Sequence, residues 1–139
     1  MKKIILVESD PLHVKMYRRM FENSDFDVEL ASTKEEMLEE LRQIRNGDSS
    51  KPDLVIMDFM LADGHGVEVL RAIKKSYLTR DIPVFAITNY ENHNFNRDIG
   101  SLGILPDKYL IKANHTPKEL LAMMNAYFDQ GKRLQTTLS

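Results

Sequence analysis

The sequence predicts an α/β protein in which helices cover both faces of a mostly parallel sheet. One feature indicates this class: short apolar runs alternate with helical patterns along the chain, and such alternation is typical of strand–helix–strand units. A second feature, the length of the chain, bears on the number of domains. A chain of 139 residues has the usual size of one domain and can bury a substantial core, so we expect a single folded unit.

Five apolar runs are expected to form the strands. They are Lys3–Val7, Phe26–Ala31, Asp53–Met57, Pro83–Thr88 and Lys108–Ile111. Helical patterns lie between them, and a further helix follows the last strand.

Three helix starts carry capping residues. Asp10-Pro11 is typical of an N-cap and first helical position, Thr33–Glu36 of a capping box, and Thr116–Glu119 of both. The apolar stripes behind these starts predict the core faces. They are Met16, Met20 and Phe21; Met37, Leu38, Leu41 and Ile44; Leu70 and Ile73; and Leu120, Leu121, Met124 and Phe128.

The segment Glu91–Gly103 is the weakest predicted helix. Phe95, Ile99 and Leu102 keep the helical spacing, but several asparagines and two glycines oppose it. We expect this segment to be the most mobile element. The domain is expected to cover residues 1–130, with residues 131–139 as a short C-terminal tail without periodicity.

Composition excludes several classes of function. A net charge of −2 leaves no general basic field, so we expect neither direct nucleic-acid binding nor binding to an anionic membrane. The absence of cysteine excludes disulfides, thiolate zinc sites and a cysteine nucleophile. The apolar run after Lys3 is too short for a signal sequence or a membrane span, and the expected location is the cytoplasm.

The chemistry is expected at the carboxyl ends of the strands, where open parallel sheets form their sites. Asp58 closes the third apolar run and is the best candidate for the reacting group. Glu8 and Asp10 follow the first run, Thr88 closes the fourth, and Lys112 follows the last. We therefore expect these side chains to converge on one point.

Such a cluster suits phosphoryl transfer. Carboxylates that repel one another are stable together only with a cation or a shared proton, and an oxygen-rich cluster suits Mg²⁺. With Lys112 neutralising phosphoryl oxygens and Thr88 donating a hydrogen bond, Asp58 is placed to attack phosphorus and form an acyl phosphate. We expect no conventional enzyme, but a protein that catalyses its own Mg²⁺-dependent aspartyl phosphorylation and slow dephosphorylation.

Four segments, taken in this order, make a specific pattern: Ile4–Pro11, Pro52–Gly66, Ile82–Thr88 and Asp107–Lys112. The pattern resembles the receiver (CheY-like) domain of bacterial two-component response regulators, over roughly residues 2 to 130. The resemblance implies a flavodoxin-like, doubly wound sheet of five parallel strands in the order 2-1-3-4-5, with five helices.

The resemblance also assigns roles to residues. Asp58 matches the phosphoacceptor, Thr88 and Lys112 the switch pair, and Tyr109 the rotating aromatic. The metal ligands that it implies are Glu8, Asp58 and the backbone carbonyl of Met60.

The implied partners are proteins. A sensor histidine kinase or phosphotransfer protein would supply the phosphoryl group. A downstream protein would bind the face made by the fourth helix, fifth strand and fifth helix, and a phosphorylation-dependent homodimer is a further option.

Two departures from the family pattern bear on the site. Ser9 stands where the family usually has a second adjacent acidic residue, so we expect weak Mg²⁺ binding, with either Ser9 or Asp10 as a further ligand. Asp10 has a competing role as an N-cap. Ala113 stands after Lys112 where the family usually has a proline, commonly with a cis peptide bond. A cis bond before alanine would cost on the order of 3 kcal/mol, so the Lys112–Ala113 bond is expected to be either trans or cis with strain, and the sequence does not decide between them.

Residues near Asp58 and Thr88, and the four histidines, carry further predictions. Met60 and Tyr90 lie two positions beyond Asp58 and Thr88, where side chains of the receiver family flank the path of hydrolytic water. The resemblance therefore implies that these bulky residues shield the acyl phosphate and slow its loss. Asp63-Gly64 is expected to make a turn. No metal role is assigned to the histidines, which show no ligand spacing. They are His13, His65, His93 and His115.

Three functions remain open from the sequence. The leading one is a stand-alone receiver that accepts a phosphoryl group on Asp58 and signals through a change of a protein-binding face. The second is a degenerate receiver that binds proteins independently of phosphorylation, motivated by Ser9 and Ala113. The third, a hydrolase or nucleotide-binding protein of the same fold class, lacks a glycine-rich phosphate loop.

Overall fold

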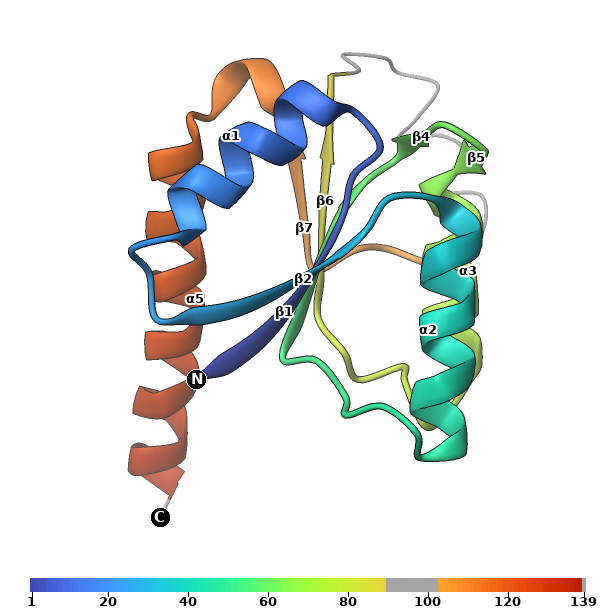
Figure 1. Cartoon of the computed structure of the whole chain (residues 1–139). Coiled ribbons are helices and arrows are strands. Elements are labelled where there is room, and N and C mark those ends of the chain that lie inside the picture. The colour runs from blue at the N-terminus through green and yellow to red at the C-terminus, as the bar shows by residue number, and fades with distance from the viewer. Residues whose placement is uncertain (90–102, 139) are drawn as a thin grey trace.

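A five-stranded parallel sheet forms the centre of the molecule, with helices on both faces (Figure 1). This computed structural model describes residues 1–89 and 103–138. The strands are β1 (Lys2–Val7), β2 (Phe26–Ala31), β3 (Leu54–Asp58), β4 (Met60–Leu61), β5 (Gly64–His65), β6 (Val84–Thr88) and β7 (Lys108–Ile111). The helices are α1 (Pro11–Phe21), α2 (Lys34–Asn46), α3 (Gly66–Lys75) and α5 (Pro117–Leu138), with a 3₁₀ turn, η1, at Lys112–Asn114.

The order of strands in the sheet is β2-β1-β3-β6-β7, and all neighbours are parallel. With the short β4 and β5 set aside, this is the predicted order 2-1-3-4-5. The chain passes outward from β1 to β2 and then returns to the other side of β1 to form β3. The strand order therefore reverses between β1 and β3, which is where open α/β sheets form their crevice.

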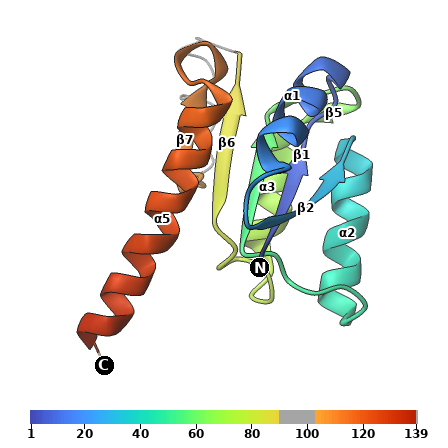
Figure 2. The ribbon, with the colours of Figure 1, turned by 60° about the vertical axis from the view of Figure 1, so that its left-hand side comes forward.

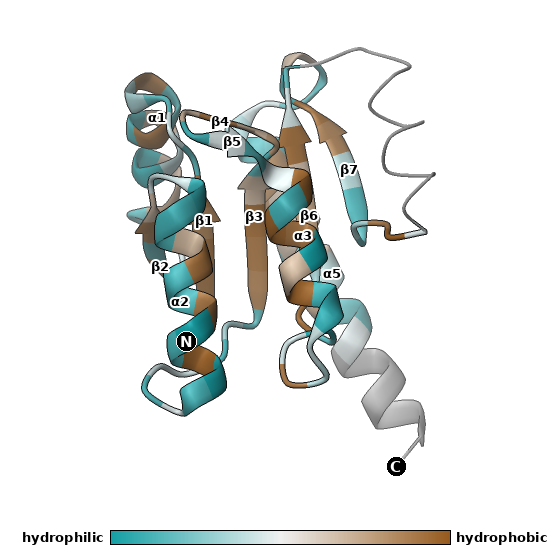
Figure 3. Cartoon of the chain, turned by 90° about the vertical axis from the view of Figure 1, so that its right-hand side faces the viewer, coloured by the Kyte–Doolittle hydropathy of each residue, from teal (hydrophilic) through white to brown (hydrophobic). Residues whose placement is uncertain are grey.

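Two hydrophobic layers hold the helices to the sheet. On one face α1 and α5 pack over alternate residues of the central strands, and on the other face α2 and α3 pack over the residues between them (Figure 2). Ile4 and Leu6 of β1 face the first layer, whereas Ile5 and Val7 face the second. Every residue of β3 and β6 is buried, and both strands are apolar up to the polar residue that ends them. Figure 3 shows the apolar colouring most clearly on β3. Burial on both sides is why parallel strands are apolar throughout.

The predicted capping residues are confirmed. The Asp10 carboxylate accepts a hydrogen bond from Leu12 N at 2.9 Å, and Thr33 Oγ1 accepts one from Glu36 N at 3.0 Å. Thr116 Oγ1 accepts one from Glu119 N at 3.1 Å. Each side chain satisfies a helical N–H that has no partner within its helix.

The C-terminal helix is longer than predicted. α5 continues to Leu138, through most of the residues that we expected to form a tail without periodicity. These residues lack an apolar period, but several of them, including Lys132, Arg133 and Leu134, are good helix formers, and a helix that is already nucleated extends at little cost. The boundary of the domain near residue 130 stays a prediction.

The predicted helix over Glu91–Gly103 lies outside the described part of the chain except for Gly103, which is in a turn. Tyr90 lies outside the described part as well. Within the described part there are four α-helices, against five predicted. None of these helices is long and apolar enough to cross a membrane.

A small hairpin that the sequence did not predict follows Asp58. β4 pairs with β5 in antiparallel register, and Ala62 and Asp63 form the turn between them, one residue earlier than the predicted Asp63-Gly64, because Gly64 belongs to β5. Gly66 ends the hairpin, where its N–H donates to Phe59 O at 2.9 Å. A Cβ at Gly66 would lie 2.7 Å from Phe59 Cδ1 and 3.0 Å from Asp58 O, so only glycine fits beside the chain that leaves β3.

We predict that Gly66→Ala lowers the free energy of unfolding by about 1–3 kcal/mol, because the added methyl group overlaps Phe59 and the backbone of Asp58. Urea unfolding would measure this. Gly131→Ala is the matched control: a Cβ there meets nothing within 4 Å, and in a helix alanine is favoured over glycine by about 0.5–1 kcal/mol. Equal effects of the two variants would contradict the close packing at Gly66.

The turn of the hairpin also caps α2. The Asp63 carboxylate accepts hydrogen bonds from Lys34 N at 2.7 Å and from Glu35 N at 3.0 Å. Partial desolvation raises the pKa of Asp63, but these two N–H donors outweigh it and hold the pKa below its ordinary value. The hairpin is thereby tied to a helix that lies next to it only in the folded protein.

Asp63→Asn is expected to lower the thermal midpoint at neutral pH, because a neutral amide caps the positive end of α2 less well. Because the pKa of Asp63 is lower in the folded state than its ordinary value of 3.8, the charged carboxylate stabilises the fold at any pH above 3.8. This contribution is lost as the pH falls below 3.8 toward the lowered pKa of the folded state. The difference between wild type and variant should therefore shrink in acid. Asp27→Asn, at an exposed position on β2, serves as the control, and a constant difference down to the lowest pH measured would refute the capping role.

Candidate functional site

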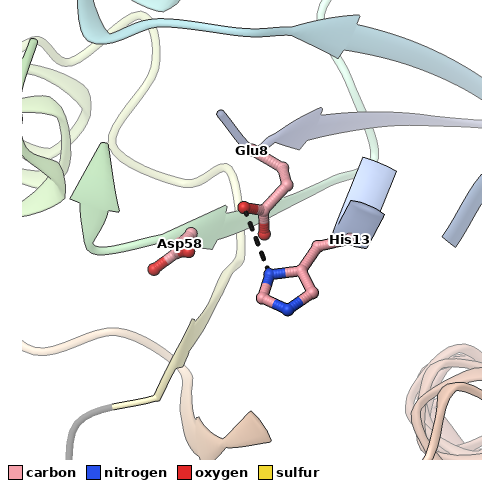
Figure 4. Close-up of side chains that lie close together, drawn as sticks. All are labelled: Glu8, His13 and Asp58. Carbon is pink, nitrogen blue, oxygen red and sulfur yellow. Dashed lines mark ion pairs between the residues drawn. The ribbon is translucent and has the colours of Figure 1, made fainter. Parts of the chain in front are cut away.

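Glu8 and Asp58 meet at the reversal of strand order, as predicted. Asp58 is the last residue of β3, and Glu8 directly follows β1, the neighbouring strand. Both residues are buried: Glu8 has no exposed surface, and Asp58 is 5% exposed. Figure 4 shows the two carboxylates side by side with the imidazole of His13. Two buried carboxylates at one point require a counter-charge.

Lys112 supplies that counter-charge. Its Nζ donates to Glu8 Oε2 at 2.7 Å and to Asp58 Oδ2 at 2.8 Å, and it lies 2.8 Å from His13 Nδ1. The lysine side chain is 6% exposed. An ammonium group has three N–H donors, so these three neighbours satisfy it completely.

The site holds more negative than positive charge. Two carboxylates surround one ammonium group, and burial raises the pKa of Glu8, an effect that Asp58 reinforces and the hydrogen bond from Lys112 opposes. Tyr17 of α1 is buried nearby, and burial together with the two carboxylates raises its pKa. The site therefore favours a further cation.

Both oxygens of Asp58 have a fixed donor. Oδ2 accepts from Lys112, and Oδ1 accepts from the backbone N–H of Met60 at 2.9 Å. The carboxylate is thus held in one orientation at the end of its strand. The Met60 side chain is 51% exposed beside it. The predicted roles of Met60, as a carbonyl ligand and as a shield for the acyl phosphate, stay predictions.

His13 belongs to this site, and the sequence reasoning missed it. The Asp10 cap and Pro11 start α1 at the carboxyl end of β1, which places His13 on the first helical turn, beside Glu8. Its Nδ1 lies 3.8 Å from Glu8 Oε1 (Figure 4). It also lies 3.5 Å from Asp10 Oδ2. The signal that could have found it is position: a histidine on the first turn of a helix that starts at a strand end is close to that end.

Ser9 and Asp10, the two candidates for a further metal ligand, have other partners. Ser9 Oγ donates to Ser32 O at 2.5 Å and accepts from Ala62 N at 3.0 Å, so it joins the loops that follow β1, β2 and β4. Asp10 caps α1 and only its second oxygen approaches His13. The structure therefore does not bring the hydroxyl of Ser9 to the carboxylate pair.

Thr88 and Tyr109 lie on the two strands beyond β3. Thr88 is the buried last residue of β6, next in the chain to Ile87, which pairs with Asp58. Tyr109 is half-buried on β7 and packs against the core beneath α2 and α3, and burial raises its pKa. The peptide bond between Lys112 and Ala113 is trans, which answers the question that the sequence left open.

The donor set fits a divalent cation. Glu8, His13 and Asp58 each present one ligand atom, and these atoms lie within 4.8 Å of one another. Buried carboxylate oxygens are ligands that Mg²⁺ accepts. Glu8 and Asp58 are thus the residues that would hold such an ion.

Comparisons with known proteins agree with this geometry. A family model described as "Response regulator receiver domain" matches residues 4–125, so the chain belongs to this family. The alkaline phosphatase synthesis transcriptional regulatory protein PhoP of Bacillus subtilis is 30% identical over 125 residues, which are 90% of this chain and 48% of PhoP. The chain thus spans about half the length of that relative.

Solved structures show the same fold. A CheY-like receiver domain protein from Methanospirillum hungatei superposes with a TM-score of 0.74 at 25% identity, covering 96% of this chain and 98% of that chain. The Mn(2+)-bound form of response regulator Rcp1 gives a TM-score of 0.73 at 26% identity, covering 88% of each. The protein is a receiver domain of the two-component response regulator family with a CheY-like fold.

Lys112→Met is expected to lower the free energy of unfolding by about 3 kcal/mol, measured by urea unfolding in a chelator, because it leaves two buried carboxylates without a cation. Adding Glu8→Gln to this variant should restore part of the loss. Lys51→Met is the control, since Lys51 and its partner Asp81 are exposed and the expected cost is below about 1 kcal/mol. If both lysine variants lose the same small amount, Lys112 is not the essential counter-charge.

Proposed function

We propose that this receiver accepts a phosphoryl group on Asp58 from a phosphohistidine of a sensor kinase or phosphotransfer protein. The observation that carries the proposal is the setting of the Asp58 carboxylate. It ends a buried strand at the reversal of strand order, with Met60 N–H on one oxygen and the Lys112 ammonium on the other. Glu8 stands beside it.

In the proposed reaction a carboxylate oxygen of Asp58 attacks phosphorus. The new O–P bond forms as the P–N bond to the donor imidazole breaks, and the released imidazole nitrogen keeps the electron pair and takes up a proton. Lys112 neutralises phosphoryl oxygens, and Thr88 at the end of the next strand donates a hydrogen bond to one of them. A divalent ion held by Glu8 and Asp58 would supply the remaining positive charge.

The output follows from a shift between two conformations. Phosphate on Asp58 draws Lys112 and Thr88 toward it, and Tyr109 on the neighbouring strand responds to the space that Thr88 leaves. The protein-binding surface would include β7 and α5 and the segment between β6 and β7. A downstream protein, or a second copy of the chain, would recognise that surface.

A degenerate receiver, which binds proteins without phosphorylation, is the second candidate. Two observations favour it: Ser9 is turned to Ser32 and Ala62, and Lys112 fills the space between the carboxylates. In this case the ammonium group would be a permanent structural substitute for the metal ion.

Intact-mass measurement after treatment with a small phosphodonor tests the proposal. With Mg²⁺, wild type should gain one phosphoryl group and Asp58→Asn none, while a chelator should abolish the gain. Asp63→Asn is the control, because Asp63 is an exposed carboxylate a few residues away that caps α2, and it should be phosphorylated as wild type is. If the wild-type protein stays unmodified with every phosphodonor and divalent ion tested, the proposal fails, and the degenerate receiver is then the better account of the function.

A further inference from the structure

The centre of the site is defined by three donor atoms from three parts of the chain. Lys112 Nζ lies 2.7 Å from Glu8 Oε2, 2.8 Å from Asp58 Oδ2 and 2.8 Å from His13 Nδ1. The ammonium group thus marks a point at which all three can contact one cation. Two of these donors are carboxylate oxygens and the third is an imidazole nitrogen.

The nitrogen of His13 is directed at that point with its lone pair. A lysine ammonium group has no acceptor, so its contact with His13 Nδ1 corresponds to the tautomer of His13 in which Nδ1 accepts the hydrogen bond. An imidazole nitrogen in this state is a ready metal ligand. Its side chain is 26% exposed, which leaves the site open to solvent on this side.

This donor set differs from an all-oxygen site in the ions that it prefers. Mg²⁺ takes oxygen ligands and keeps several of its waters, whereas imidazole suits zinc, copper, iron and nickel. Affinity for a site with nitrogen rises along the first row, from manganese through cobalt and nickel. Ser9, turned away to Ser32 and Ala62, adds no oxygen that would offset this preference.

The size of the site is compatible with such an ion. Metal–ligand distances to oxygen and nitrogen are about 2.0–2.2 Å. Each donor would therefore have to approach the centre by about 0.6 Å from its present distance to Lys112 Nζ, after the ammonium group has withdrawn. The flexible stem of lysine allows this exchange, so Lys112 and a metal ion compete for one position.

We propose that His13 is a metal ligand of this site, and that with Glu8 and Asp58 it selects first-row transition-metal ions such as Zn²⁺, Co²⁺ or Mn²⁺ over Mg²⁺. The inference deepens the proposed function, because it rests on the same carboxylate pair holding the cation. It assigns to the chain a cation class that the oxygen ligands alone would not select.

Calorimetric titration of the apoprotein with Zn²⁺, Mn²⁺ and Mg²⁺ tests this. Wild type should bind Zn²⁺ more tightly than Mg²⁺. His13→Ala should weaken Zn²⁺ binding by at least about tenfold, because the loss of a residue that only hydrogen-bonds to a metal ligand already costs about tenfold or more in metal affinity. The same substitution should change Mg²⁺ binding little.

His115→Ala is the matched control. His115 Nδ1 lies 3.7 Å from Glu119 Oε2, so it too is a partly buried histidine beside a carboxylate, and its loss should leave Zn²⁺ binding as it is. Co²⁺ gives a second readout: the visible absorption of the bound ion should change in His13→Ala and stay the same in His115→Ala. Thermal unfolding of each metal-free variant checks that it is folded.

Two results would overturn the inference: an unchanged Zn²⁺ affinity in His13→Ala, or an equal loss for Zn²⁺ and Mg²⁺. The proposed function fails separately. If His13-dependent Zn²⁺ binding is found but no metal supports phosphorylation of Asp58, the metal site stands and the phosphoacceptor role falls. If Mg²⁺-dependent phosphorylation is found and is the same in His13→Ala, and no metal affinity depends on His13, the phosphoacceptor role stands and the metal-ligand role of His13 falls.

Discussion

The interaction on which the site depends is the contact of one buried ammonium group with two buried carboxylates. Lys112 lies between Glu8 and Asp58, three residues from three different strand ends, and none of them is stable in this place alone. The parallel sheet brings the three together, because its strands end at one edge and its order reverses between β1 and β3. Two carboxylates face one ammonium group, and the remaining negative charge is the physical basis of the proposed cation site.

Around this pair, the loops are held in place by contacts between distant segments. Ser9 joins the loops after β1 and β2 to the hairpin, and Asp63 joins the hairpin to α2. Gly66 lets the chain turn back against the backbone of Asp58. These contacts tie the loops around the site to one another, and Lys112 Nζ lies at its centre between the two carboxylates. A metal ion or a phosphoryl group would act by displacing or redirecting that side chain.

The fold was largely predictable because its signals are local. A buried parallel strand must be apolar along its length, and a helix start must satisfy its free N–H groups, so strands such as β3 and caps such as Thr33 are visible in the sequence. The hairpin after Asp58 was not predicted, because two residues per strand carry no periodicity. The helical structure of the last residues, up to Leu138, was not predicted for a related reason. These residues favour a helix individually, but they have no apolar stripe at helical spacing from which a helix could be predicted.

The sequence by itself determined the alternation of strands and helices and the placement of Asp58, Glu8 and Lys112 at strand ends, because these follow from which residues are apolar and which residue ends each run. The order of the strands and the family were predicted from the resemblance of four segments to receiver domains. Tertiary structure decided what each polar side chain contacts: His13 enters the site, Ser9 turns to Ser32, and Asp10 stays a cap. The physical reason is that a side chain near a strand end has several partners within reach, and only the packing of the surrounding loops selects among them.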